Sequence, residues 1–117
     1  MTLKECYEIL GADLDGALKR LSNEKLVERF ALKFLNDTSF EELEKALGDK
    51  NYEEAFRAAH TLKGVAANLS FSRLHDVSAE FTEMLRGGNA PADEAYMEIV
   101  RAEYTRTVEA LKQLQGA

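Results

Sequence analysis

Cysteine is almost absent from this sequence. Cys6 is the one cysteine among 117 residues, so an internal disulfide cannot form. The Cys and His residues also lack the spacing of zinc ligands, which argues against a structural metal site. The shortage of cysteine excludes a disulfide framework and fits a reducing compartment.

Long hydrophobic runs are missing too. The first residues, MTLKECYEIL, have neither the basic segment nor the apolar stretch of a signal peptide. Nowhere do about 18 apolar residues follow one another, as a bilayer-spanning helix requires. We therefore expect a cytoplasmic protein with no membrane partner. The start at Met1 and the lack of a linker favour a free-standing protein over a domain cut from a longer chain.

Positive charge is in deficit, since the formal net charge is -6. Binding of duplex nucleic acid needs clustered Lys and Arg that displace counterions, so we expect no nucleic-acid partner. Hydrophobic residues make up 45% of the chain and charged residues 31%, which is typical of a globular protein. The length suits a single domain over residues 1–117.

Proline occurs once, and no segment shows a sustained period of two. Helix-forming residues are frequent, so the predicted class is all-α. Short connections of about two to six residues favour antiparallel neighbours. We therefore predict an antiparallel up-and-down four-helix bundle with additional short N-terminal helices. The expected helices are Thr2–Leu10, Asp13–Leu21, Asn23–Asn36, Ser39–Gly48, Tyr52–Leu69, Ser72–Arg86 and Ala92–Gln115.

Start signals precede four of these helices. They are Ser22 as an N-cap, the capping-box pair Ser39 and Glu42, the similar pair Asn51 and Glu54, and Pro91 in the first turn of the last helix.

The helix over Tyr52–Leu69 contains the residues that point to a chemical function. At about 100° per residue, His60 points roughly 140° away from the centre of the apolar stripe, so its side chain should be exposed. The stripe consists of Ala55, Ala59, Leu62, Ala66 and Leu69. The outer face around His60 holds Phe56, Arg57, Gly64 and Ala67, with Lys63 on the flank.

This surrounding suits a nucleophilic imidazole. Gly64 costs the helix roughly 1 kcal/mol relative to alanine and leaves room beside His60 for a bulky group or a partner. Lys63 could neutralise a phosphoryl group on the imidazole, which is largely neutral near pH 7. These residues fit in-line attack on a phosphoryl group held by another protein. Because the chain lacks a Gly-rich loop, we do not expect it to take phosphate from ATP.

The segment HTLKGVAANLSF at positions 60–71 resembles the signature of histidine-phosphotransfer (HPt) domains. The resemblance covers roughly Lys25 to Leu111 and implies a four-helix bundle with added helices. It also implies that His60 is phosphorylated, that Lys63 stabilises the phosphate and that Gly64 provides clearance for a docking receiver domain.

Two positions depart from the family pattern. The family often has glycine where Ser70 stands, and often Glu or Gln where Thr82 stands. Thr82 could still donate a hydrogen bond to the imidazole, although less strongly than a carboxylate would orient it. His75 has none of the motif around it and is interpreted as an ordinary surface residue.

The resemblance implies a phosphorelay intermediate rather than an enzyme. His60 would accept a phosphoryl group from a receiver aspartate and pass it to another receiver. The partners would be the receiver domains of response regulators and hybrid histidine kinases. This chain would act as a monomer without a cofactor, and the Mg²⁺ would be bound by the receiver. Phe56, Arg57 and Ala67 are the predicted partner contacts, and Phe56 is equally compatible with a boundary position of the core.

Two other functions are alternatives to phosphotransfer for a helical bundle. A helical adaptor would bind receiver domains without phosphotransfer, and substitution of His60 would distinguish it. A di-iron bundle enzyme needs paired Glu-x-x-His motifs, but Arg57 and Ser72 stand three residues before the two histidines.

Overall fold

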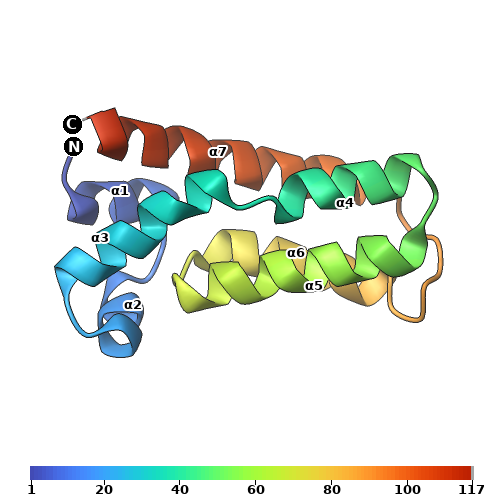
Figure 1. Cartoon of the computed structure of the whole chain (residues 1–117), viewed down its shortest axis with the longest axis horizontal. Coiled ribbons are helices and arrows are strands. Elements are labelled where there is room, and N and C mark those ends of the chain that lie inside the picture. Colours follow the sequence, from blue (N-terminus) through green and yellow to red (C-terminus); the bar gives the residue numbers. More distant parts are fainter. Residues whose placement is uncertain (117) are drawn as a thin grey trace.

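The computed structural model describes residues 1–116, and this part of the chain contains helices and no strand (Figure 1). The all-α prediction is therefore confirmed. No helix within these residues is both long and apolar enough to cross a membrane. The elements are α1 (Leu3–Leu10), α2 (Leu14–Leu21), α3 (Glu24–Lys33), the 3-10 helix η1 (Phe34–Asn36), α4 (Ser39–Gly48), α5 (Tyr52–Asn68), α6 (Ser72–Met84) and α7 (Tyr96–Gly116).

The four-helix arrangement is visible in Figure 1. The helices α3, η1 and α4 follow one another along α7, and α5 and α6 form the other two rods. The chain reverses between α4 and α5 and again between α5 and α6, so these neighbours are antiparallel. The short helices α1 and α2 lie at the end of the bundle where both termini meet. The predicted bundle with extra N-terminal helices is thus confirmed.

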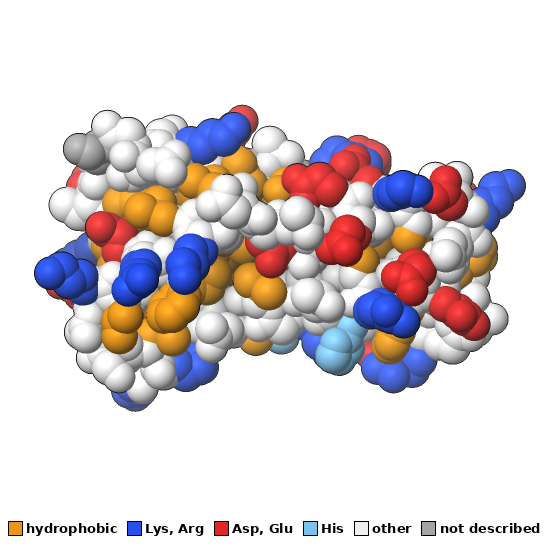
Figure 2. All heavy atoms as spheres, viewed as in Figure 1, with side chains coloured by type: hydrophobic (Ala, Val, Ile, Leu, Met, Phe, Trp, Pro, Cys, Tyr) orange, Lys and Arg blue, Asp and Glu red, His pale blue; other side chains and the backbone are white. Residues whose placement is uncertain are grey.

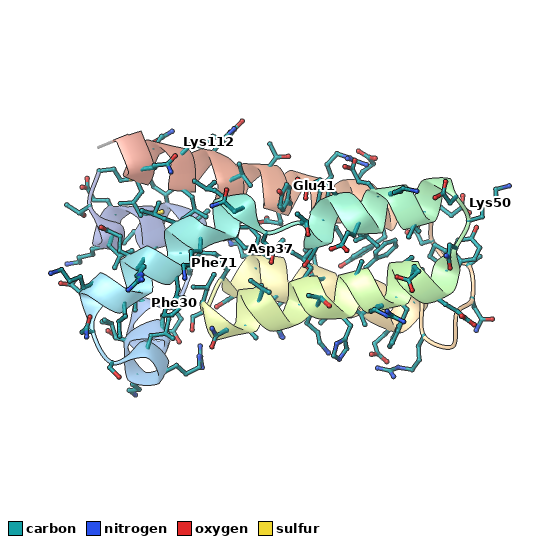
Figure 3. The ribbon with its side chains drawn as sticks, viewed as in Figure 1. Phe30, Asp37, Glu41, Lys50, Phe71 and Lys112 are labelled. Carbon is teal, nitrogen blue, oxygen red and sulfur yellow. The ribbon has the colours of Figure 1, made fainter. Side chains whose placement is uncertain are left out.

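One apolar core runs through all seven α-helices. Phe71, labelled in Figure 3, is an anchor of this core at the end near α1. Its ring centroid lies 5.6 Å from that of Tyr7 and 5.8 Å from that of Phe34. Aromatic rings at this spacing pack favourably in tilted or edge-on geometry. Helix α1 therefore contributes to the same core as the helices of the bundle.

The structure confirms one of the four predicted start signals, Asn51 at the start of α5. Asn51 caps α5 as expected, because its side chain accepts a hydrogen bond from the Glu54 amide at 3.3 Å. Helix α3 is capped by Asn23 and not by Ser22, since Asn23 accepts from the Leu26 amide at 2.9 Å. Ser22 instead ends α2 with a φ of 82°. Two adjacent cap-forming residues left the sequence ambiguous by one position.

The capping box predicted for Ser39 and Glu42 is wrong. The Asp37 carboxylate accepts a hydrogen bond from the Ser39 amide at 2.9 Å, and the Thr38 hydroxyl donates to Glu42 at 3.1 Å. Asp37, labelled in Figure 3, therefore organises the start of α4 from a position outside the helix. A short Asp side chain binds nearby backbone amides readily, and here it takes the role predicted for Ser39.

The last helix begins at Tyr96 and not at Ala92, so Pro91 does not lie in its first turn. The Asp93 carboxylate accepts from the Ala95 amide at 3.1 Å, and the Asp93 carbonyl accepts from the Tyr96 amide at 3.1 Å. This local turn delays the start of the helix. Helix α6 also ends earlier than predicted, which places Arg86 in the turn that follows it.

Ser70 makes the tight connection between α5 and α6. Its φ of 56° is in the left-handed region that favours glycine. This explains why glycine suits the position, and Ser70 adopts the same conformation with a side chain. The Ser70 hydroxyl accepts a hydrogen bond from Arg20, whose Nε also donates to the Asn68 carbonyl at 3.3 Å. Helix α2 thereby holds the C-terminal end of α5 in place.

Candidate functional site

His60 lies in the middle of α5, on the side turned away from the core. It is exposed, whereas Ala59 beside it is completely buried. The predicted core stripe is buried along its whole length, at Ala55, Ala59, Leu62, Ala66 and Leu69. The predicted orientation of His60 is therefore confirmed, and its imidazole is approachable from solvent.

A groove of about 630 Å³ lies on one side of His60, between α5 and the α3–η1 segment. Phe30 and Asp37, both labelled in Figure 3, belong to the wall opposite α5. Phe30 is exposed, and the Lys33 ammonium lies 5.2 Å from its ring centroid. The complete lining is Phe30, Lys33, Phe34, Asn36, Asp37, His60, Thr61, Gly64, Val65, Asn68 and Leu69. The imidazole thus borders a hollow with apolar walls and a charged rim.

Gly64 is part of the α5 wall of this groove, one turn after His60. A Cβ atom built on Gly64 meets no atom within 4 Å. The fold of this chain therefore does not require glycine there, although a mid-helix glycine costs roughly 1 kcal/mol relative to alanine. What the missing side chain provides is open space beside the imidazole.

The opposite side of His60 faces α6. The Phe56 ring centroid lies 6.0 Å from that of His60, and the two planes are inclined by 35°. Phe56 is half-buried, so it occupies the boundary between core and surface. Lys63 is also half-buried on this flank, where the sequence placed it.

Arg57 and Ala67 are exposed, as expected of partner contacts. The Arg57 guanidinium lies 3.4 Å from the Glu54 carboxylate one turn earlier. Ala67 borders a separate, smaller depression together with Arg20 and His75. The structure therefore does not bring Ala67 into the groove, and the contact roles of Arg57 and Ala67 stay predictions.

Two residues near this flank were missed at the sequence level. Arg86 donates from Nε and Nη2 to the Glu83 carboxylate at 2.9 Å and 2.7 Å, and its guanidinium carbon lies 5.2 Å from the Phe56 ring centroid. The bonds from Arg86 lower the pKa of the Glu83 carboxyl, and the Lys63 charge acts in the same direction. The three-residue spacing of Glu83 and Arg86 indicates an ion pair, but only the packing of α6 against α5 brings this pair to Phe56.

The predicted hydrogen bond from Thr82 to the imidazole is wrong. Thr82 is completely buried, and its hydroxyl donates to the Ser78 carbonyl at 2.6 Å. A helical threonine commonly bonds to the carbonyl four residues earlier, and this bond uses the single donor proton of the hydroxyl. Within residues 1–116, the aromatic neighbour of the imidazole is the Phe56 ring.

Charge is unevenly distributed around the site. On the face shown in Figure 2, Lys and Arg side chains gather over α3 with hydrophobic atoms between them, while Asp and Glu side chains gather over α4. Across the described residues, His, Cys, Asp and Glu form no group of three that could hold a metal ion. The site therefore offers an exposed imidazole with an open groove on one side, Lys63 one turn along the helix and Arg86 against the neighbouring Phe56 ring.

Comparison with known families gives one match. The family model described as "Hpt domain" matches residues 35–115, which is more than half of the chain. The matched segment contains α4 to α6, most of α7 and the whole motif around His60. No curated protein and no solved structure matches the chain.

Proposed function

Because the chain belongs to the Hpt domain family, which serves phosphotransfer in two-component signalling, we propose that it is a relay intermediate phosphorylated on His60. It accepts the phosphoryl group from the aspartate of one receiver domain and passes it to the aspartate of another. The observation that carries the proposal is the exposed imidazole of the family motif at the edge of an open groove.

The transfer step is a substitution at phosphorus. The unprotonated ring nitrogen of His60 attacks, so an N–P bond forms while the P–O bond to the receiver aspartate breaks. The aspartate carboxylate leaves with the electron pair, and the imidazole keeps the proton on its other nitrogen. Transfer to the second receiver is the same step in reverse. Such a reaction depends on positioning and charge stabilisation, which is consistent with a carrier and not a kinase.

The chain's own residues have distinct parts in this proposal. Lys63 supplies positive charge to the phosphoryl group, and Gly64 leaves space for the receiver backbone. The groove between α5 and α3 takes apolar side chains of the receiver, with Phe30 as an exposed contact. Mg²⁺ belongs to the receiver, and this chain contributes no cofactor. A cytoplasmic, monomeric protein remains our prediction.

The decisive experiment compares three proteins: wild type, His60→Gln and His75→Gln. Each is incubated with a panel of phosphorylated receiver domains, and transfer of labelled phosphate is followed over time. His75 is the matched control, because it is the other histidine of the chain and lies near Asp76, with its Nδ1 3.0 Å from that carboxylate.

The proposal predicts acid-labile, base-stable label on wild type and His75→Gln and none on His60→Gln. Binding of receivers by all three proteins without labelling would instead establish an adaptor. A wild-type chain that takes up no label and binds no receiver would contradict the relay function altogether.

A further inference from the structure

Three cations lie in a row on the outer face of α3. Lys25, Arg29 and Lys33 are exposed and follow one another at intervals of four residues, so they share one face over about 12 Å of helix. Within residues 1–116 none of the three forms an ion pair, whereas Arg57 on α5 and Arg101 on α7 pair with glutamates. Because like charges four residues apart weaken a helix, this basic row does not serve the stability of α3.

The basic row continues the rim of the groove beside His60. Lys33 lines that groove together with the exposed Phe30, and its ammonium lies 5.2 Å from the Phe30 ring centroid. Lys25 and Arg29 are outside the groove lining, toward the start of α3. Figure 2 shows hydrophobic atoms between the Lys and Arg side chains over α3. The row is therefore a mixed basic and apolar surface that a protein seated in the groove would meet beyond the imidazole.

The sign of the surface charge changes from α3 to α4. Glu41 and Glu42 on α4 are exposed, and Asp and Glu side chains gather over this helix in Figure 2. With a formal net charge of -6, most of the chain repels a negatively charged partner. The basic row is a local exception, so a partner with an acidic edge is attracted with that edge over α3. The row also precedes the family match, which begins at residue 35.

We propose that Lys25, Arg29 and Lys33 select among receiver domains by attracting those whose docking face has an acidic patch, and that they fix the orientation of approach. This inference rests on the proposed function of His60. Charges at the rim of an interface act mainly on the association rate and on its salt dependence. The basic row thus governs the encounter of the two proteins, and the transfer step itself belongs to His60 and its neighbours.

The test separates encounter from transfer. Stopped-flow mixing with each receiver of the panel gives the association rate constant at low and high ionic strength, and labelling at saturating receiver gives the rate of the transfer step. The variants are Lys25→Glu combined with Arg29→Glu, and Arg29→Glu alone, so the groove lining is left intact. The matched control combines Lys50→Glu with Lys112→Glu, which makes the same charge change at two exposed positions away from the groove (Figure 3). Thermal unfolding checks that each protein is folded.

At low ionic strength we expect the double variant to associate about tenfold or more slowly with the receivers that wild type binds fastest, and Arg29→Glu about threefold more slowly. High salt should bring wild type and variants together, because it screens exposed charges. The transfer rate at saturation should stay within about twofold of wild type, since the variants leave the reacting groups in place. The control should associate at nearly the wild-type rate.

A double variant that associates as fast as the control, or that slows only the saturated transfer step, overturns the inference. Wild-type binding to vesicles of phosphatidylserine and phosphatidylcholine, lost in the double variant while receiver association is unchanged, would assign the row to a membrane surface and overturn it too. If wild type binds receivers but takes no label, the proposed function fails alone, and the association rates still decide the role of the row. A wild-type chain that neither binds nor takes label overturns both.

Discussion

Gly64 and His60 are neighbours on the surface of α5, one turn apart. A side chain at position 64 would meet open space within this chain and the docking partner outside it. At position 64, helix stability therefore favours a residue with a side chain, whereas access for a receiver favours glycine.

Replacement of Gly64 by glutamine should separate the two demands. We expect the free energy of unfolding to rise by up to about 1 kcal/mol, because glutamine is the better helix former. Transfer from a receiver should slow about tenfold or more, because the reacting atoms can no longer reach their in-line geometry. Denaturant unfolding and rapid-quench labelling measure the two effects. Gly48→Gln is the control, since Gly48 is also helical and open to solvent but lies on α4. Wild-type transfer by Gly64→Gln would refute the clearance role.

Tyr7 ties α1 to the end of α5 through one buried hydrogen bond. Its hydroxyl donates to the Leu69 carbonyl at 2.8 Å, and burial raises the pKa of the phenol far above its usual value. Tyr7→Phe should lower the free energy of unfolding by about 1 to 3 kcal/mol, since it leaves the buried carbonyl without this donor. Urea titration measures the loss. Tyr52→Phe is the comparison, because Tyr52 is a half-buried tyrosine at the other end of α5, and a loss as large there would contradict the assignment to Leu69.

At the scale of helices, the ends of α4 and α5 depend on two non-glycine residues with positive φ. Lys50, labelled in Figure 3, follows α4 with a φ of 56°, as Ser70 does after α5. The Asn51 amide donates to the Ala46 carbonyl at 2.8 Å across this turn, which closes the end of α4. At the end of α1 a glycine, Gly11, has the same conformation with a φ of 61°.

Substitution of lysine by glycine should therefore change the free energy of unfolding in opposite directions at two positions near the end of α4. Lys50→Gly should stabilise the protein by about 1 kcal/mol, because it removes the steric cost of a side chain in the left-handed region. Lys45→Gly should destabilise it by a similar amount, because position 45 is inside the helix. Thermal and denaturant unfolding of both variants test the pair. Destabilisation by Lys50→Gly would show that the lysine side chain outweighs the backbone strain.

At the scale of the whole molecule, the N-terminal helices share the core of the bundle, although the family match begins at residue 35. Arg106 on α7 donates to the carbonyls of Ile9 and Leu10 at 2.7 Å and 3.0 Å, which holds the end of α1. Leu3, Cys6, Tyr7 and Leu10 are buried in the common core.

Deletion of residues 1–22 should therefore cost more than about 3 kcal/mol of stability, since it removes several buried side chains at once. The loss should appear as a lower unfolding midpoint and as exposure of Phe71 and Phe34 to apolar dyes. Deletion of residues 115–117 is the control, because it leaves the buried Leu114 in place. An unchanged midpoint in the first deletion would show that the bundle from α3 to α7 is stable alone.

The sequence by itself determined the helices, the class of the fold and the outward orientation of His60. These features follow from the local periodicity of apolar residues, which can be recognised within a single helix. The motif from His60 to Phe71 also sufficed to indicate the family and the roles predicted for Lys63 and Gly64.

Only the tertiary structure decided which side chains meet across helices. It showed that Thr82 does not donate to the imidazole, because its buried hydroxyl donates to the Ser78 carbonyl of the same helix. The structure also showed caps that the sequence did not single out: Asp37 accepts from the Ser39 amide at the start of α4, and Asp93 accepts from the Ala95 amide before α7 begins at Tyr96. It also formed the groove beside Gly64 and brought Arg86 to Phe56. The groove and the contact between Arg86 and Phe56 join residues far apart in the chain, and periodicity within one helix has no information about the packing angle and register of the next.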